Sequence, residues 1–313
     1  MTSNKKNKRK LIIITGPTAC GKTSIAVRVA NNINGEIISA DSRQVYKGMD
    51  IGTGKDLEEY QVNGKTISYY LIDILDPMEN YSVHNFQKDF YKSFNTINSK
   101  NKIPIICGGT GLYIESILLD YDLSEKPPPD EDLRKKLVGY NKEELLAVLS
   151  QLSNPEDMDK MLLVTKKQIT RNIEILKNTK PILGFSLSPL NNNALIIGLN
   201  IDRELLREKI KIRLEERVNN GMIQEVENLI KNGMPLERLD YFGLEYKFIG
   251  KYLKGITTRD EMLEGLKTSI RKFAKRQRTW FRRMEKRGVN IKWVEYDDYK
   301  AVLNLSKNYI DES

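Results

Sequence analysis

The chain is poor in the residues that build cross-links and most structural metal centres. Of its 313 residues, two are cysteines, Cys20 and Cys107, and one is a histidine, His84. Two thiols cannot make a disulfide framework, and these three side chains are too few for a four-ligand zinc site. We therefore expect a protein of the reducing cytoplasm. Cys107 ends an apolar run and is expected in the core, whereas Cys20 is interpreted as a small residue that fits its loop rather than as a reactive thiol.

Long apolar runs are also absent. No stretch approaches the roughly 18 or more apolar residues that a membrane-spanning helix needs. The basic start, Met1–Lys10, lacks the apolar core of a signal peptide. We therefore expect no membrane span, and we interpret the start as a solvated tail.

Acidic residues are the minority among the charged ones. The chain has 42 Asp and Glu against 51 Lys and Arg, a net charge of +9, and such an excess suggests a polyanionic partner. Basic residues are densest in the segment 271–283. There, contact with a nucleic-acid backbone and an ordinary amphipathic helix with a solvated basic side are both possible interpretations. If the segment is a helix, one face carries Arg271, Lys275, Arg278 and Arg282, and a second face carries Phe273, Trp280 and Met284.

The pattern G-x-x-x-x-G-K-[ST] is complete in one place, between the apolar run Leu11–Ile14 and a helix-compatible stretch, Ser24–Asn31. In this context backbone N–H groups point inward and the helix N-terminus adds positive partial charge, so the loop captures an anion. Lys22 adds a full charge, and the Thr23 hydroxyl can ligate Mg²⁺. We predict a P-loop that binds a diphosphate or a nucleotide such as ATP, formed by Gly16, Pro17, Thr18, Ala19, Cys20, Gly21, Lys22 and Thr23.

Strand and helix signals alternate along the first part of the chain. This alternation predicts an α/β fold with a P-loop NTPase-like core, in which a parallel, doubly wound sheet collects ligands at the carboxyl ends of its strands. The predicted strands are Leu11–Thr15, Glu36–Ser39, Ile67–Ile72, Ile103–Cys107 and Ala194–Asn200. The predicted helices include Lys22–Asn32, Val83–Asn98, Glu204–Asn219, Met222–Asn232, Phe248–Leu253 and Arg259–Lys286.

A helical segment interrupts this alternation. It follows Pro127–Pro129, and from Asp130 to about Leu183 the sequence favours helices without strands. We predict that residues 120–188 form an all-helical insertion, and that residues 1–119 and 189–313 form the α/β core with its C-terminal helices.

The stretch Ser39–Thr53, SADSRQVYKGMDIGT, is highly distinctive. Together with the P-loop, it resembles the tRNA dimethylallyltransferases (tRNA isopentenyltransferases) of bacterial type. Other stretches match the family in the same order, so the resemblance runs from Gly16 to Arg282. They are Leu71–Pro77 with Tyr81–Val83, Gly108–Tyr113, Gly221–Val226 and Ala274–Arg282.

The resemblance implies a reaction and its partners. It implies transfer of a dimethylallyl group from dimethylallyl diphosphate to N6 of the anticodon-adjacent adenosine (position 37) of tRNA, with release of diphosphate and use of Mg²⁺. Asp41 is then the base, although a role as a Mg²⁺ or Thr23 partner stays open. Arg213 is then a diphosphate clamp, although a solvated salt-bridge face stays open. We expect a monomer.

The resemblance also implies the residues that bind tRNA. Two of these residues have structural alternatives that stay open. Thr110 could instead cap a helix, and Arg134 could be an ordinary surface charge. The helical insertion is implied to bind tRNA as well. The implied residues are Asp41, Ser42, Arg43, Gln44, Thr110, Arg134, Lys167, Gln168, Ile169, Thr170 and Arg171.

Two stretches depart from the family pattern. Residues 164–171 match it only at Arg171 and the helix that this residue opens. A later Gly-Tyr-[Arg/Lys]-[Gln/Glu] element reads Glu245-Tyr246-Lys247-Phe248 and keeps only its two middle positions. Because both stretches lie where the family addresses tRNA, we predict an altered tRNA preference or a specialised paralogue.

Three other functions remain open from the sequence. A small-molecule P-loop kinase predicts ATP turnover, and a free-adenylate prenyltransferase predicts prenylation of AMP without tRNA. A non-catalytic RNA-binding P-loop protein predicts that Asp41→Ala has little effect.

Overall fold

The computed structural model describes residues 10–119, 130–159, 161, 163, 165–178 and 189–312. The chain divides into two compact units, one of Met1–Leu118 with Ser188–Ser313 and one of Leu119–Leu187. Residues 1–9 of the N-terminal tail, Pro127–Pro129 and Val164 of the departing stretch lie outside the described residues.

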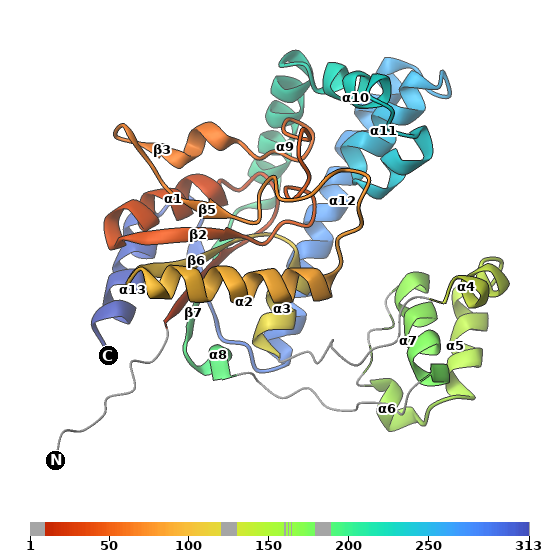
Figure 1. Cartoon of the computed structure of the whole chain (residues 1–313), viewed down its shortest axis with the longest axis horizontal. Helices are drawn as coiled ribbons and strands as arrows, with labels where there is room; N and C mark the ends of the chain where they lie inside the picture. Colours follow the sequence, from red (N-terminus) through yellow and green to blue (C-terminus); the bar gives the residue numbers. More distant parts are fainter. Residues whose placement is uncertain are drawn as a thin grey trace. The chain divides into compact units, whose positions relative to one another are not determined.

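The larger unit is built on a six-stranded sheet in the order β5-β2-β6-β1-β7-β8, and every neighbouring pair is parallel (Figure 1). All residues of β1 and β2 are buried, as expected for parallel strands covered on both faces. The six strands are β1 (Leu11–Thr15), β2 (Gly35–Ser39), β5 (Tyr69–Tyr70), β6 (Ile103–Gly108), β7 (Ala194–Asn200) and β8 (Ile291–Glu295). A separate antiparallel pair consists of β3 (Gln61–Val62) and β4 (Lys65–Thr66).

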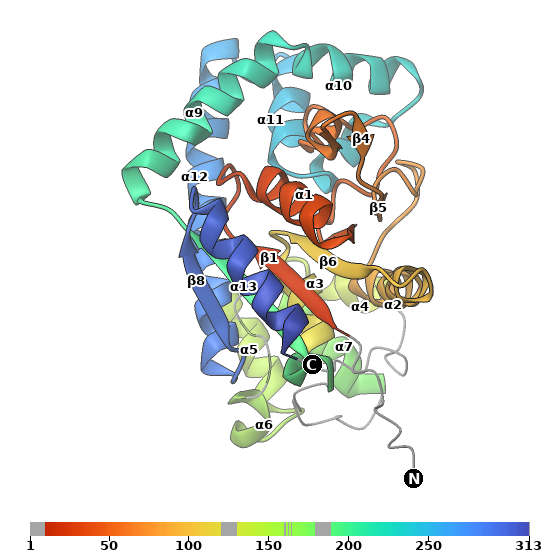
Figure 2. The ribbon, with the colours of Figure 1, turned by 90° about the vertical axis from the view of Figure 1, so that its left-hand side faces the viewer.

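Helices cover both faces of this sheet. Ile12 and Ile14 of β1 share one hydrophobic cluster with α1 and α13, while α2 and α3 pack against each other on the opposite face (Figure 2). The cluster draws alternate residues from each strand, because successive side chains of a strand point to opposite faces. These helices are α1 (Lys22–Ile33), α2 (Val83–Ser99), α3 (Gly111–Leu118) and α13 (Tyr299–Asp311), and the short α8 (Pro189–Asn192) precedes β7.

The remaining helices of the larger unit follow β7 in the chain. Helix α9 ends at Asn219, as the sequence predicts, because Gly221 adopts φ 94°, a left-handed conformation that stops the helix. Helix α12 packs against α9, α11 and α3. These helices are α9 (Arg203–Asn219), α10 (Met222–Lys231), α11 (Leu244–Leu253) and α12 (Arg259–Lys286). A 3₁₀ turn at Leu236–Tyr241 lies between α10 and α11, and another, at Leu57–Tyr60, lies between β2 and β3.

The smaller unit consists of helices in its described residues, α4 (Glu131–Leu137), α5 (Lys142–Ser150), α6 (Pro155–Asp159) and α7 (Lys166–Asn178). Its own core is formed by Leu133, Leu137, Leu145, Leu149, Ile169 and Ile173. None of the helices described in either unit is long and apolar enough to cross a bilayer.

The predicted α/β class with a parallel sheet is confirmed. The predicted strand Ile67–Ile72 is wrong in extent. Only Tyr69–Tyr70 pairs with β2, because Leu71 at φ 64° and Asp73 at φ 55° turn the backbone away. No individual strand or helix is predicted beyond Lys286, where the structure adds the edge strand β8 and helix α13.

Candidate active site

The P-loop connects β1 to α1 and presents the N-terminus of that helix. Ala19 at φ 62° and Gly21 at φ 83° take left-handed conformations, which turn successive N–H groups toward one side. The N-cap of α1 is Gly21, which has no side chain to satisfy the first N–H groups of the helix. Lys22 is the first helical residue, and its Nζ atom donates to the Pro17 carbonyl at 2.7 Å. The loop is therefore arranged for a phosphate.

Gln277 of α12 ties the P-loop to the loop after β6. Its Oε1 atom accepts from the Thr18 N–H at 2.8 Å, and its Nε2 atom donates to the Gly109 carbonyl at 2.9 Å. A Cβ atom at Gly109 would collide with this amide, so the glycine is required there. Gln277 is 7% exposed. Gln277 is not predicted as a site residue from the sequence, although it is the one neutral residue in the basic run Lys275–Arg278.

The loops after β2 and β6 are joined by hydrogen bonds, because the carboxyl ends of neighbouring parallel strands meet at one edge. The Ser42 N–H donates to the Thr110 hydroxyl at 3.1 Å, and the Thr110 N–H donates to the Ala40 carbonyl at 3.1 Å. Asp41 Oδ1 accepts from the Arg43 N–H at 2.8 Å, which orients the carboxylate. Thr110 thus connects the two loops through its hydroxyl.

The side-chain amide of Gln44 forms hydrogen bonds inside the protein. Its Oε1 atom accepts from the Ser39 hydroxyl at 2.9 Å, and its Nε2 atom donates to the Gly54 carbonyl at 2.8 Å. The amide therefore braces the loop that follows Tyr46, and its implied contact with tRNA stays a prediction.

The same loop is held from the other side by Glu225 of α10. The Glu225 carboxylate accepts from the N–H groups of Asp50, Ile51 and Gly52 at 2.7, 2.7 and 3.0 Å, and from the Tyr246 hydroxyl at 2.7 Å. A Cβ atom at Gly52 would overlap the Tyr246 ring. Glu225 belongs to a stretch that resembles the family, and Tyr246 is one of the two positions that the later departing element keeps. The structure shows that both position residues 50–52.

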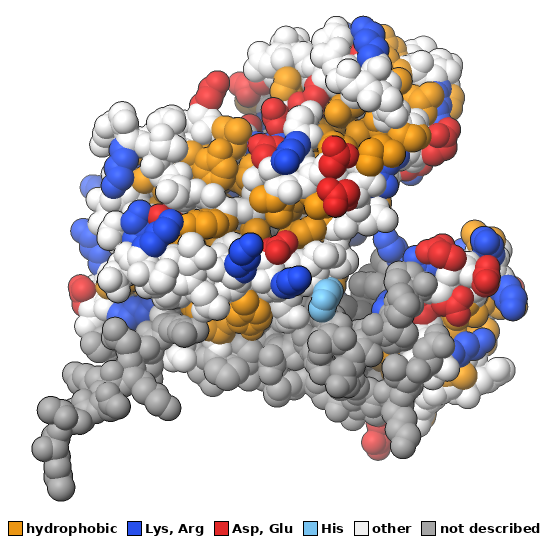
Figure 3. Space-filling model, viewed as in Figure 1, with side chains coloured by type: hydrophobic (Ala, Val, Ile, Leu, Met, Phe, Trp, Pro, Cys, Tyr) orange, Lys and Arg blue, Asp and Glu red, His pale blue; other side chains and the backbone are white. Residues whose placement is uncertain are grey.

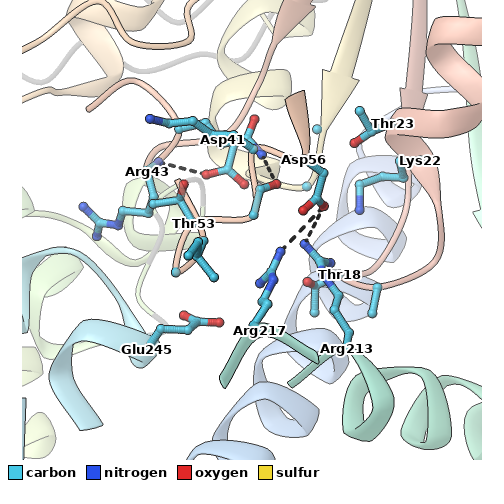
Figure 4. Close-up of a pocket in the computed structure, with 18 of the residues that line it drawn as sticks. Thr18, Lys22, Thr23, Asp41, Arg43, Thr53, Asp56, Arg213, Arg217 and Glu245 are labelled. Carbon is cyan, nitrogen blue, oxygen red and sulfur yellow. Dashed lines mark hydrogen bonds and ion pairs between the residues drawn. The ribbon is translucent and has the colours of Figure 1, made fainter. Parts of the chain in front are cut away.

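These loops surround one cavity of about 1220 Å³ within the larger unit (Figure 4). The cavity brings together the P-loop, the base implied by the resemblance and the implied clamp, although they come from three separate parts of the chain. The predicted site residues that line it are Thr18, Ala19, Gly21, Lys22, Thr23, Asp41, Ser42, Arg43, Gln44, Thr110 and Arg213. Phe273 and Arg276 of α12 line it as well.

Two arginines of α9 share one carboxylate at the wall of this cavity. The Nη2 atoms of Arg213 and Arg217 lie 3.3 and 3.7 Å from Asp56 Oδ2 (Figure 4). Burial, together with the neighbouring Arg213, lowers the pKa of Arg217 to about 10. Burial raises the pKa of Glu245, which lies on α11 in the same wall, and Arg217 opposes that rise. Neither Asp56 nor Arg217 is predicted as a site residue from the sequence.

Both cysteines are buried. The Cys20 side chain is fully buried inside the P-loop, which favours its interpretation as a small packing residue. Burial raises the pKa of Cys107 to about 12, so this thiol stays protonated in the core.

The arrangement has counterparts among known proteins. A family model described as IPP transferase matches residues 44–284, and one described as Isopentenyl transferase matches residues 9–75. The chain belongs to the IPP transferase family. The family resemblance predicted from the sequence is thereby confirmed.

Relatives match along nearly their whole length. The tRNA dimethylallyltransferase 2 of Bacteroides fragilis is 48% identical over 294 residues, which cover 91% of this chain and 92% of that relative. The tRNA dimethylallyltransferase 1 of Syntrophus aciditrophicus is 44% identical over 296 residues, which cover 94% and 96%. The crystal structure of the full-length tRNA isopentenylpyrophosphate transferase from Bacillus halodurans is similar with a TM-score of 0.71 and 32% identity, and covers 97% of this chain and 98% of that one.

In this member of the IPP transferase family, α12 carries the basic segment, but its faces differ from the prediction. Arg278 does not belong to a free basic face, since its guanidinium donates to the Ile201 carbonyl. Phe273 does not belong to the buried face, since it is 38% exposed and lines the cavity. On the side of the molecule shown in Figure 3, basic side chains are dispersed among acidic and hydrophobic ones. The buried face of α12 around the site is Ala274, Gln277, Phe281 and Met284, and its exposed basic residues include Lys272, Lys275, Arg276 and Arg282.

In the smaller unit, several predicted tRNA-binding residues have structural partners. Arg134 and Arg171 both bind the fully buried Glu174, with N···O distances of 2.6 and 2.8 Å. The Ile169 side chain is fully buried in the core of this unit, and its implied contact with tRNA stays a prediction. Gln168 accepts from the Thr165 N–H at 3.0 Å at the start of α7. Lys167 is exposed, Thr170 is half-buried, and their implied contacts stay predictions.

Replacing Arg134 by Ala is expected to lower the free energy of unfolding of the smaller unit by about 1–2 kcal/mol, because the buried Glu174 carboxylate loses charge-assisted hydrogen bonds while Arg171 remains. Urea unfolding of the full chain, followed by circular dichroism, measures this. Lys135→Ala is the matched control on the same helix, since Lys135 is exposed and its one ion pair within the described part of the chain is with exposed Asp132 at 3.4 Å. Equal stability of Arg134→Ala and the wild type, with weaker tRNA binding, would instead make Arg134 an RNA contact.

Proposed function

We propose that this protein transfers a dimethylallyl group from dimethylallyl diphosphate to N6 of the anticodon-adjacent adenosine (position 37) of tRNA, and releases diphosphate. The carrying observation is that Asp41 and the P-loop line one cavity. Membership of the IPP transferase family and relatives named tRNA dimethylallyltransferase give independent support.

In the proposed reaction, Asp41 takes the proton that N6 of adenine loses. The exocyclic amine is a weak nucleophile, so a positioned carboxylate assists its attack on the allylic carbon. The Arg43 N–H holds one carboxylate oxygen at 2.8 Å, which leaves the second oxygen for the amine. The C–N bond forms as the allylic C–O bond breaks, and the electron pair of that bond leaves with the diphosphate.

The P-loop stabilises the leaving group. Negative charge grows on the diphosphate as the C–O bond breaks, and the α1 N-terminus with Lys22 lies where that charge develops. Arg213, which lines the same cavity, adds a guanidinium. The P-loop then binds a leaving group rather than a nucleotide that is hydrolysed.

Magnesium fits the oxygen donors of the cavity if the ion arrives bound to the diphosphate. Among the described residues, no three His, Cys, Asp or Glu side chains come together to hold a metal ion by themselves. The Thr23 hydroxyl lines the cavity and offers one hard oxygen, and Mg²⁺ in proteins commonly takes one or two protein ligands together with phosphate oxygens. When bound, the ion supplies charge neutralisation at the diphosphate.

The tRNA partner must present its adenosine outside the anticodon stack. Extruding a base costs on the order of a few kcal/mol, which contacts elsewhere on the RNA must offset. The exposed basic residues of α12 and the smaller helical unit are the proposed contact regions. The altered tRNA preference predicted from residues 164–171 and 245–248 belongs to this part of the proposal.

The test is incubation of the full chain with Mg²⁺, radiolabelled dimethylallyl diphosphate and tRNA from cells that lack this modification. We expect label in tRNA, no label in a transcript that carries guanosine at position 37, and loss of label when EDTA removes Mg²⁺. AMP and ATP serve as parallel substrates. Prenylated AMP without labelled tRNA, or turnover of ATP, would contradict the proposal and favour the small-molecule prenyltransferase or the kinase.

A further inference from the structure

Arg217 lacks an adequate partner for a buried guanidinium. Its side chain is 13% exposed, and its contact with Asp56 Oδ2, at 3.7 Å, is too long for a hydrogen bond. The Nη2 atom of Arg217 is buried and has no hydrogen-bond partner among the described residues. A buried cationic donor without a partner is costly, so a site that keeps one invites an anionic ligand.

The chain makes room for this guanidinium. Gly54 has φ 63°, and a Cβ atom at this position would overlap the guanidinium groups of both Arg217 and Arg213. Gln44 holds the Gly54 carbonyl at 2.8 Å, next to the Asp41 loop. The glycine therefore lets the two arginines approach the loop that carries Asp56, and no side chain separates them from it.

The two arginines also face the P-loop directly. Arg213 and Arg217 are four residues apart on α9 and therefore lie on the same side of that helix. A small pocket beside the main cavity is lined by both arginines together with Thr18 and Ala19 of the P-loop. An anion held at the P-loop is thus bordered by two guanidinium forks, whose geometry suits bidentate binding of phosphate.

The Asp56 carboxylate lies where such an anion would bind the arginines. It is the one carboxylate that forms ion pairs with both of them among the described residues. Glu245 lines the same small pocket but forms no ion pair with either arginine among the described residues. Asp56 itself is 43% exposed and sits in a left-handed conformation at the start of a 3₁₀ turn, so its ion pairs are weak and open to exchange.

We propose that Arg217 is a second diphosphate-binding residue beside Arg213, and that Asp56 is the counter-ion that diphosphate displaces from both arginines. This inference rests on the proposed function, because it assigns the diphosphate to the P-loop. On binding, phosphate oxygens replace Asp56 as acceptors of the guanidinium N–H groups, and the carboxylate moves toward solvent. Asp56 then competes with the substrate and lowers its affinity, which also favours release of the diphosphate product.

The experiment measures binding of inorganic pyrophosphate to the full chain by titration calorimetry, with Mg²⁺ present. Arg217→Gln is expected to weaken binding roughly 10- to 100-fold, the effect of losing charge-assisted hydrogen bonds. Asp56→Asn is expected to tighten binding about 3- to 10-fold, because the competitor is removed while the side-chain shape is kept. In the double variant, the gain from Asp56→Asn should shrink, since its main partner is gone.

Arg207→Gln is the matched control, because Arg207 lies on α9 outside the cavity and pairs with Glu204 at 2.6 Å. It should bind pyrophosphate as the wild type does. Arg217→Lys keeps the charge and should give intermediate affinity, which covers the case that Arg217→Gln does not fold. Wild-type affinity in both Arg217 variants, or weaker binding in Asp56→Asn, would overturn the inference.

The outcomes separate this inference from the proposed function. Wild-type protein that labels tRNA, with Arg217 variants of unchanged pyrophosphate affinity, defeats only the inference. Wild-type protein that does not label tRNA, with weaker pyrophosphate binding in Arg217→Gln, defeats only the proposed reaction.

Discussion

Asp41→Asn is expected to lower kcat for prenyl transfer to tRNA by about 10²- to 10⁴-fold, the range for loss of a general base. Asparagine keeps the size of the side chain and the oxygen that accepts from the Arg43 N–H, so the loop after β2 keeps its shape. Affinity for pyrophosphate should stay within about twofold, since the P-loop is untouched. Single-turnover labelling of tRNA measures the chemical step separately from product release.

Asp76→Asn is the matched control for this prediction. Asp76 makes the same kind of turn, in which Oδ1 accepts from the Met78 N–H at 2.8 Å, but it lies outside the cavity. It should leave kcat unchanged. Near-wild-type transfer by Asp41→Asn would remove Asp41 from the reaction, and would favour a non-catalytic role for the block around it.

Lys22→Ala is expected to lower kcat/KM for dimethylallyl diphosphate by about 10²- to 10³-fold, the effect of removing one donor that stabilises developing charge. Lys22 is the first residue of α1 and lines the cavity, so its ammonium group borders the proposed diphosphate site. Part of the loss should fall on kcat, because the negative charge of the leaving group is larger in the transition state than in the substrate. Steady-state kinetics at saturating tRNA separates the two parameters.

Lys88→Ala controls for the loss of a helix lysine, since Lys88 is exposed on α2 and lies outside the cavity. Thermal unfolding of Lys22→Ala should match that of the wild type. A Lys22→Ala enzyme with a raised KM but an unchanged kcat would mean that Lys22 binds substrate and transition state equally, and would contradict its role at the leaving group.

The sequence predicted the core of the fold well, because its main signals are local. Continuous apolar runs mark the strands that are covered on both faces, such as β1 and β2. The glycines of the P-loop and Gly221 mark backbone conformations that other residues seldom adopt. Elements at the edge of the sheet were harder to predict. Strand β8 reads Ile-Lys-Trp-Val-Glu, and most of its side chains are exposed or half-buried, so its pattern is weak.

The details of the site depended on partners that are distant in sequence. Gln44 has the amide that would suit an adenine edge, but Ser39 and Gly54 take up its hydrogen-bonding groups. Arg278 belongs to a basic run, but the Ile201 carbonyl lies beside it. Gln277 becomes a structural tie only because α12 brings it between the P-loop and Gly109.

By itself, the sequence predicted the P-loop and the parallel α/β class, because these follow from contiguous residues and from the alternation of strand and helix signals. It predicted the family through the resemblance of several contiguous stretches. Only the tertiary structure decided which polar side chains face the cavity and which form hydrogen bonds inside the protein. It also decided that Arg217 and Asp56 meet beside Gly54, although they are far apart in the chain. The physical reason is that the function of a charged or amide side chain depends on the groups that lie within hydrogen-bonding distance of it. The packing of segments that are distant in sequence decides which groups those are.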